Sequence, residues 1–136
     1  MENIHIEPTN NTPLITCDTA TNTITIQGES RPENVRAFYA SVFKWIDDYE
    51  KSLFYLSSLS TTEKKITLNL KLDYFNSSSL KIFMEIIARL YDISKNVKRI
   101  NLAINWYYEG DDEDMLDSGK EFEKMTGVTM NYIVNS

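Results

Sequence analysis

The chain has 136 residues, of which 42% are hydrophobic and 25% are charged, a composition typical of one folded domain covering residues 1–136. No apolar stretch approaches the roughly 18 uncharged residues of a membrane span, and the N-terminus lacks the pattern of a signal peptide, so we expect a cytoplasmic protein. The single cysteine, Cys17, and the single histidine, His5, argue against an internal disulfide, a thiolate metal cage and most histidine-dependent catalysis.

The excess of acidic residues is confined to one short segment. Lys and Arg total 14 against 20 Asp and Glu, and without the segment 109–117 the remaining acids number 14 as well. A neutral body with one acidic patch argues against a nucleic-acid groove and against an anionic membrane surface. The six acids of the patch are Glu109, Asp111, Asp112, Glu113, Asp114 and Asp117.

The first third of the chain predicts a hairpin followed by a helix. Residues 1–13 read as an initial strand or arm and a turn, and the alternating runs 14–18 and 23–27 predict two paired strands, the second ended by Gly28. The segment 30–33 combines a capping Ser, a Pro and a Glu three residues after the Ser, which predicts a helix start at Ser30. Its apolar stripe comprises Val35, Phe38, Val42, Trp45, Ile46, Tyr49, Leu53 and Leu56.

The rest of the chain alternates between strand and helix patterns. Alternation over 66–74 predicts a central strand with one wet face, and helical spacing over 80–91 predicts a second helix. A strand over 100–108, a helix stopped by Gly127 and a last strand over 128–134 complete the order. Strands separated by helices are usually parallel with right-handed crossovers, so we expect a single-domain α/β fold, a mixed β-sheet with about three helices.

Four polar residues, Asn76-Ser77-Ser78-Ser79, stand where the central strand meets the second helix. Asn and Ser are ordinary helix caps, and that role alone explains their presence. A regulatory phosphoacceptor is the sharper interpretation, because a phosphate at this position would be stabilised by the helix dipole and free N–H groups. Three successive hydroxyls leave the acceptor open at this point.

Two other chemistries are less well supported. A nucleophilic serine at this turn needs flanking glycines and a histidine base, and the neighbours of Ser77 are Asn76 and Ser78. A calcium loop counted from Asp111 places Leu116 and Phe122 where a Gly and a Glu are required. We therefore expect no enzyme, no metal and no cofactor, and we interpret the acidic segment as a solvated helix start, with a docking patch for a basic partner as the second interpretation.

Three longer motifs occur together: GESRPEN at 28–34 with FY at 38–39, DYFNSSSLK at 73–81, and NWYYEGDDEDMLDSG at 105–119. Together they resemble the SiaC family of bacterial regulatory phosphoproteins, and the similarity runs from about Thr12 onward. The resemblance implies a fold similar to the STAS domain of anti-sigma-factor antagonists. It also implies a partner-switching protein, phosphorylated by a dedicated serine/threonine kinase, restored by a PP2C-like phosphatase, and binding and activating a diguanylate cyclase when unphosphorylated.

The family's phosphoacceptor is the hydroxyl residue directly after the motif Asn, which here is Ser77, with Ser78 and Ser79 as alternatives. We expect the partner surface to surround the start of the second helix, and to include Asn76, Ser77, Ser79, Leu80, Arg31 and Glu33. The competing hypothesis is a binding module that senses a small ligand on the same scaffold. It predicts a concave site lined by Trp45, Tyr49 or Trp106.

Overall fold

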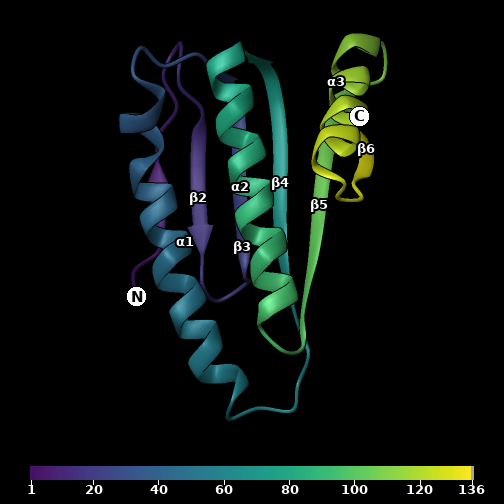
Figure 1. Cartoon of the computed structure of the whole chain (residues 1–136). Coiled ribbons are helices and arrows are strands. Elements are labelled where there is room, and N and C mark those ends of the chain that lie inside the picture. Colours follow the sequence, from purple (N-terminus) through teal and green to yellow (C-terminus); the bar gives the residue numbers. More distant parts are fainter. Residues whose placement is uncertain (136) are drawn as a thin grey trace.

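One mixed sheet runs through the molecule, and the computed structural model describes it over residues 1–135 (Figure 1). In these residues the strand order is β1-β2-β3-β4-β5-β6. The elements in chain order are β1 (Ile4–Ile6), β2 (Leu14–Asp18), β3 (Thr23–Ser30), α1 (Val35–Ser57), β4 (Lys64–Phe75), α2 (Ser77–Asn96), β5 (Ile100–Glu109), α3 (Glu113–Thr126) and β6 (Asn131–Asn135).

The sheet changes from antiparallel to parallel at β3. Strands β1, β2 and β3 pair antiparallel, and the turn between β2 and β3 places Asn22 at a φ of 56°, a conformation that Asn tolerates well. Strands β3, β4, β5 and β6 pair parallel, each joined to the next by one helix. This arrangement confirms the predicted mixed α/β sheet that starts with an antiparallel hairpin.

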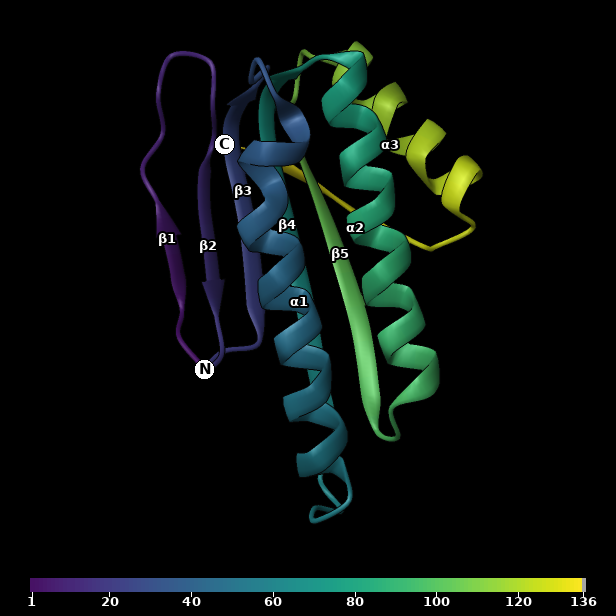
Figure 2. The same ribbon diagram turned by 60° about the vertical axis from the view of Figure 1, so that its left-hand side comes forward.

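All three helices lie on one face of the sheet (Figures 1 and 2). This follows from the topology, because right-handed crossovers that always move in the same direction along the sheet stay on the same side. The core lies between the layers: Ile66, Leu68 and Leu70 of β4 are at most 1% exposed, as are Val42 and Ile46 of α1. The alternating and helical patterns of the sequence therefore mark the buried faces correctly.

The other face of the sheet carries a row of polar side chains across four strands. Asn131 donates through Nδ2 to Asn105 Oδ1 (3.1 Å), and Asn105 donates to Asn69 Oδ1 (2.9 Å). Asn69 in turn donates to Thr25 Oγ1 at 3.3 Å. Since a slip of one residue would turn these amides into the core, the row supports the register of the parallel strands.

The start of α1 differs from the prediction. Ser30 does not cap this helix: it is the last residue of β3 and is fully buried, whereas Asn34 caps α1 by accepting from the Ala37 N–H (3.1 Å). Gly28 does not end β3, because at a φ of 113° it forms an irregularity after which the strand continues for two residues. The chain therefore travels further along the sheet before it turns into the helix.

Smaller differences concern the ends of elements. Leu56, predicted on the apolar face of α1, is 40% exposed near the C-terminal end of that helix. Tyr74, at the end of the alternating run 66–74, is 51% exposed because the pairing of β3 with β4 shifts register and skips Asp73. Tyr74 therefore points away from the helices, and Phe75 packs against Phe83 of α2 instead. Val128 and Met130 are buried but precede β6, which begins at Asn131. Over residues 1–135, no helix combines the length and the apolar character needed to cross a membrane.

Gly119 provides a test of the contact between α3 and β5. A Cβ at this position would lie 2.7 Å from Cδ1 and Nε1 of Trp106, a fully buried ring whose Nε1 donates to the Met115 carbonyl (2.9 Å). We predict that Gly119→Ala lowers the free energy of unfolding by about 1–3 kcal/mol through overpacking, despite the better helix propensity of Ala. Urea denaturation measures the change.

Gly110→Ala is the matched control, because its added Cβ would meet only Val134 Cγ1 at an ordinary 3.5 Å. Its unfolding midpoint should stay close to that of the parent protein. An equal effect of the two substitutions would contradict the tight packing of α3 on Trp106.

Candidate functional site

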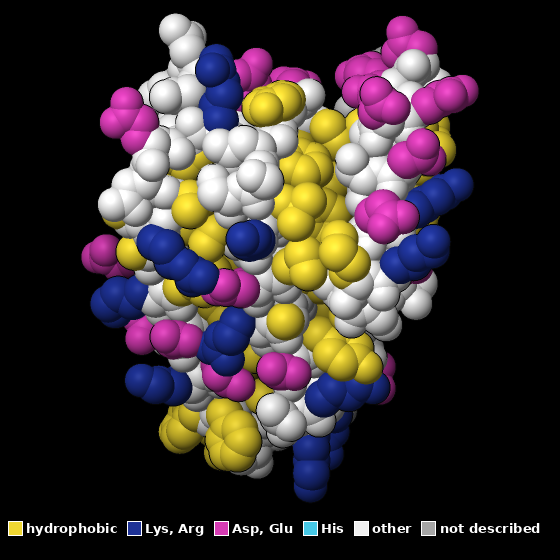
Figure 3. Space-filling model, turned by 45° about the horizontal axis from the view of Figure 1, so that its top comes forward, with side chains coloured by type: hydrophobic (Ala, Val, Ile, Leu, Met, Phe, Trp, Pro, Cys, Tyr) yellow, Lys and Arg dark blue, Asp and Glu magenta, His cyan; other side chains and the backbone are white. Residues whose placement is uncertain are grey.

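The candidate site lies at the edge of the sheet where the parallel strands end. Strands β3, β4 and β5 each lead into a helix there, and the three helices are capped by Asn34, Asn76 and Asp112. Figure 3 looks toward this end and shows acidic side chains gathered on one side of it. In parallel sheets this edge is the usual binding edge, because loops and helix N-termini with free N–H groups meet there.

Asn76 organises the start of α2. Its Oδ1 accepts from the Ser79 N–H (2.9 Å) and from the Ser78 hydroxyl (3.1 Å), and its carbonyl oxygen accepts the first helical hydrogen bond from the Leu80 N–H (3.0 Å). The N–H groups of Ser77 and Ser78 donate to no acceptor in residues 1–135. Two donors at the positive end of the helix dipole are therefore available to an incoming group.

The structure distinguishes the three serines that the sequence left equivalent. Ser79 is fully buried, which argues against its expected places on the partner surface and as an alternative phosphoacceptor. Ser78 is exposed, but its hydroxyl donates to Asn76. Ser77 is exposed, and within residues 1–135 its hydroxyl has no hydrogen-bond partner. Of the three, Ser77 alone has a hydroxyl that is both exposed and without a hydrogen bond to residues 1–135.

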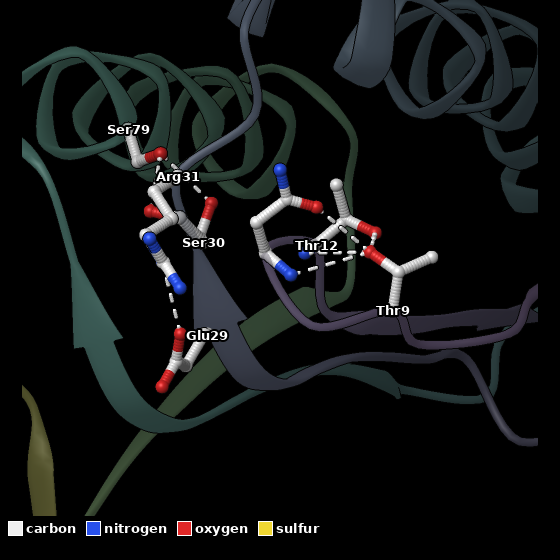
Figure 4. A network of polar contacts seen from close by, with 7 residues as sticks. Thr9, Thr12, Glu29, Ser30, Arg31 and Ser79 are labelled. Atoms are coloured by element: carbon white, nitrogen blue, oxygen red, sulfur yellow. Dashed lines mark hydrogen bonds and ion pairs between the residues drawn. The ribbon is translucent and has the colours of Figure 1, made fainter.

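A buried chain of three hydroxyl groups, those of Ser79, Ser30 and Tyr39, supports this helix start, and Figure 4 shows its Ser30 and Ser79 members. The Ser79 hydroxyl donates to the Ser30 carbonyl (2.9 Å) and lies 2.8 Å from Ser30 Oγ, which lies 2.6 Å from the Tyr39 hydroxyl. Because each hydroxyl has one proton, Ser30 must donate to Ser79 and Tyr39 to Ser30. Burial raises the pKa of Tyr39, so its hydroxyl remains a donor.

The segment after β3 lies beside the start of α2. The Asn76 N–H donates to the Ser30 carbonyl (3.1 Å), which places the Arg31–Glu33 segment next to the serines, as the sequence-based hypothesis assumed. The Arg31 N–H donates to the Asn11 carbonyl (2.9 Å), and its Nε donates to Glu29 at 3.0 Å (Figure 4). The side chains of Arg31 and Glu33 are exposed, and Leu80 is half-buried.

Sequence reasoning missed Ser30 and Tyr39 as supports of the site. Ser30 matches a helix-capping motif, which predicts an exposed cap where the structure has a buried strand end, and Tyr39 appears in the sequence only as part of the FY motif at 38–39. No signal in the sequence reveals that their hydroxyl groups meet, because the contact to Ser79 spans 49 residues.

The single cysteine, the single histidine and three buried aromatic residues are the other candidates for a functional role. Burial raises the pKa of the Cys17 thiol to about 12, which removes its thiolate at neutral pH, and His5 lies on β1 beside Glu7 (2.7 Å), three strands away from β4. Trp45, Tyr49 and Trp106 are at most 4% exposed. Trp45 lines a surface hollow of about 340 Å³ beside the N-terminus, to which neither Tyr49 nor Trp106 contributes. The ligand-sensing hypothesis stays a prediction.

The acidic segment forms the start of α3, as predicted. Asp112 caps the helix by accepting from the Met115 N–H (3.0 Å), and Glu113 and Asp114 occupy its first turn, where negative charge is favourable. All six acids except the half-buried Asp112 are exposed. In residues 1–135 no group of three or more potential ligands is close enough to hold a metal ion. The expected lack of a metal remains a prediction.

Comparison with known proteins identifies a family and a relative of this chain. The sequence model of the SiaC family regulatory phosphoproteins matches residues 6–135. An uncharacterized protein of Pseudomonas aeruginosa (strain UCBPP-PA14) is 27% identical over 124 residues, which cover 91% of this chain and 90% of that protein.

Two solved structures from Pseudomonas aeruginosa share the fold. The crystal structure of apo-SiaC has a TM-score of 0.79 and 25% identity, and the match covers 98% of this chain and 100% of that one. The structure of the diguanylate cyclase SiaD in complex with its activator SiaC has a TM-score of 0.80 and 24% identity, covering 97% of this chain and 99% of that one.

The buried hydroxyl chain leads to a stability prediction. Ser79→Ala removes the acceptor for the Ser30 hydroxyl at a fully buried position, so it should lower the free energy of unfolding by about 1–3 kcal/mol. Ser78→Ala, one residue away and exposed, should cost less than about 0.5 kcal/mol. Thermal or urea denaturation of both variants measures the difference, and equal losses would refute the buried network.

Proposed function

Because this chain belongs to the SiaC family of regulatory phosphoproteins, we propose that it is a phosphorylation-controlled partner-switching protein with Ser77 as the switch residue. In its unphosphorylated form it binds and activates a signalling enzyme, a diguanylate cyclase, and phosphorylation of Ser77 releases that enzyme. The protein itself is a binding module and catalyses no reaction.

One observation carries the assignment of Ser77. Of the three serines at the start of α2, it alone combines exposure with a hydroxyl that makes no hydrogen bond to residues 1–135. A kinase has to place this oxygen in line with the γ-phosphate of ATP, which requires a side chain that is free to leave the surface. Ser78 would first have to break its bond to Asn76, and Ser79 would have to leave the core.

The position also explains how a phosphate would act. A phosphate on Ser77 is stabilised by the helix dipole and by the free N–H groups of Ser77 and Ser78. The same two donors are the groups that a docked partner can use with its own oxygen atoms. Phosphate and partner therefore compete for one pair of donors, and the added charge would have to be desolvated on docking.

The partner surface follows from the side chains that are exposed or half-buried around these donors. We assign to it Asn76, Ser77 and Leu80 at the start of α2, together with the neighbouring Arg31 and Glu33. Ser79 is left out, since its side chain is covered and holds the helix start in place.

Three partners act on this surface in the proposal. A serine/threonine kinase adds the phosphate, a PP2C-like phosphatase removes it, and the cyclase binds the restored form. The cyclase is supported by the similar fold of SiaC in its complex with SiaD. The kinase and the phosphatase are supported by the family's description as regulatory phosphoproteins.

Replacement of the switch residue gives a direct test. Ser77→Ala should abolish phosphorylation by the cognate kinase, measured as the loss of the phosphate mass on the intact protein. Because Asn76 still caps α2, the free energy of unfolding should change by less than about 0.5 kcal/mol. Ser78→Ala should be phosphorylated like the parent protein, and full phosphorylation of Ser77→Ala would move the switch to another residue.

Phosphorylation should weaken the complex with the cyclase. We predict that the protein phosphorylated on Ser77 binds the cognate diguanylate cyclase at least about ten-fold more weakly, or about 1.4 kcal/mol. Calorimetric titration measures the affinity, and the rate of cyclic di-GMP formation gives the functional readout. Ser77→Ala treated with kinase should keep full affinity, and equal affinity of the two forms of the parent protein would end the switch proposal.

A further inference from the structure

A groove separates α2 from α3 next to the proposed switch residue. Its volume is about 410 Å³, and in Figure 3 hydrophobic surface runs along it with a row of acidic side chains on one side. We call it the α2/α3 groove. It is lined by Leu80, Asp114, Asp117, Ser118, Glu121 and Met125.

The acidic side chains of the groove all come from one face of α3. Asp114, Asp117 and Glu121 follow one another at steps of three and four residues, the spacing of a single helix face. Glu121 has a loose ion pair with Lys124 at 3.9 Å, and Asp114 and Asp117 form no salt bridge with residues in 1–135. This wall therefore presents carboxylates whose charge the protein itself balances only in part.

Apolar side chains supply the rest of the groove. Met125 is 50% exposed and Leu80 is half-buried. An occupant of the groove would therefore cover apolar surface on both side chains. A second hollow adjoins the first and shares Asp114 and Ser118 with it, and Phe75 and Met115 contribute to its lining. Apolar surface bordered by carboxylates thus extends from the end of β4 along α3, and Leu80 is the contribution of α2.

We infer that the α2/α3 groove receives a helix of the partner protein, one with an apolar stripe flanked by Lys or Arg residues. The apolar stripe would cover Leu80 and Met125, and the basic side chains would pair with the acidic wall. The identity of the partner as a signalling protein rests on the proposed function. The kind of segment that binds is inferred from the chemistry of the groove.

Charge argues against the other occupants of an apolar groove. A second copy of this chain would bring a further net charge of −6 toward an already acidic wall. An anionic lipid surface or a nucleic acid would be repelled by the same carboxylates. A basic amphipathic helix is the occupant that both the apolar and the charged parts of the groove favour.

The groove and the switch residue are close along α2. Leu80 follows Ser77 by one helical turn, so a helix seated against Leu80 ends near the free N–H groups at the start of α2. The positive end of α2 would accept oxygen atoms of the partner, and the acidic face of α3 would accept its cations. A phosphate on Ser77 would occupy the first of these two contacts.

The test uses the unphosphorylated full chain and a synthetic peptide of about five helical turns, with leucines on one face and lysines on the other. A triple variant, Asp114→Asn, Asp117→Asn and Glu121→Gln, removes the acidic wall. The matched control, Glu109→Gln, Asp111→Asn and Glu113→Gln, removes three charges that do not line the groove. Two-dimensional NMR of the labelled protein verifies folding, locates the peptide and measures its affinity.

We expect the peptide to shift the amide signals of Leu80 and of residues 114–125, and to bind the triple variant about ten-fold more weakly than the parent. The control should bind like the parent, Met125→Ser should weaken binding without loss of fold, and a peptide with Glu in place of Lys should not bind. Added salt should weaken binding to the parent more than to the triple variant.

Equal affinity for the triple variant and its control, or shifts confined to another surface, would overturn the inference. Dimerisation of the parent that is lost in Met125→Ser would also overturn it, because a second copy would then occupy the groove. This assay needs neither kinase nor cyclase, so its failure is distinct from a failure of the proposed switch. Conversely, the kinase assay on Ser77→Ala has no bearing on the affinity of the groove for the peptide, whatever its outcome.

Discussion

The carbonyl group of Ser30 holds the site together. It accepts hydrogen bonds from the Asn76 N–H and from the Ser79 hydroxyl, and so joins the end of β3 to the junction between β4 and α2. The Ser30 side chain adds Tyr39 of α1 to the same point. Because Ser30, Tyr39 and Ser79 are fully buried and their side-chain oxygen atoms are all paired, displacement of one element would leave polar groups without partners. The exposed serines are thus carried on a rigid base.

The topology places the chemistry at one end of the molecule. Three crossovers of the same hand bring the N-termini of α1, α2 and α3 to the edge where the parallel strands end. The helix dipole makes each N-terminus favourable for negative charge, and a side-chain oxygen caps each of the three helices there. Only α3 adds a run of acids to its cap. The asymmetry between the uncharged start of α2 and the acidic start of α3 produces two different surfaces a short distance apart.

The hydrophobic periodicity that determines the fold is visible in the sequence, but the long-range hydrogen bonds that shape the candidate site are not. Alternation in β4 and helical spacing in α1 and α2 depend on which face is buried, which is a local property of the chain. The role of Ser30 depends on a contact across 49 residues, and its capping motif indicated a different local structure. The same limit applied to the serines: sequence places all three at the helix start, and only packing buries Ser79 and leaves Ser77 free.

The two surfaces at this end impose opposite demands on a phosphate. The start of α2 stabilises it through the dipole and two free N–H groups, whereas Asp112 and Asp114 border the hollow that also includes Asp73 and Phe75, close to Ser77 in the chain. Repulsion from these carboxylates offsets part of the stabilisation, so the phosphate would not be bound as firmly as on a neutral surface. A partner that supplies both acceptors for α2 and cations for α3 meets no such conflict. In the proposed switch, the unphosphorylated Ser77 is therefore the state whose charge fits such a partner.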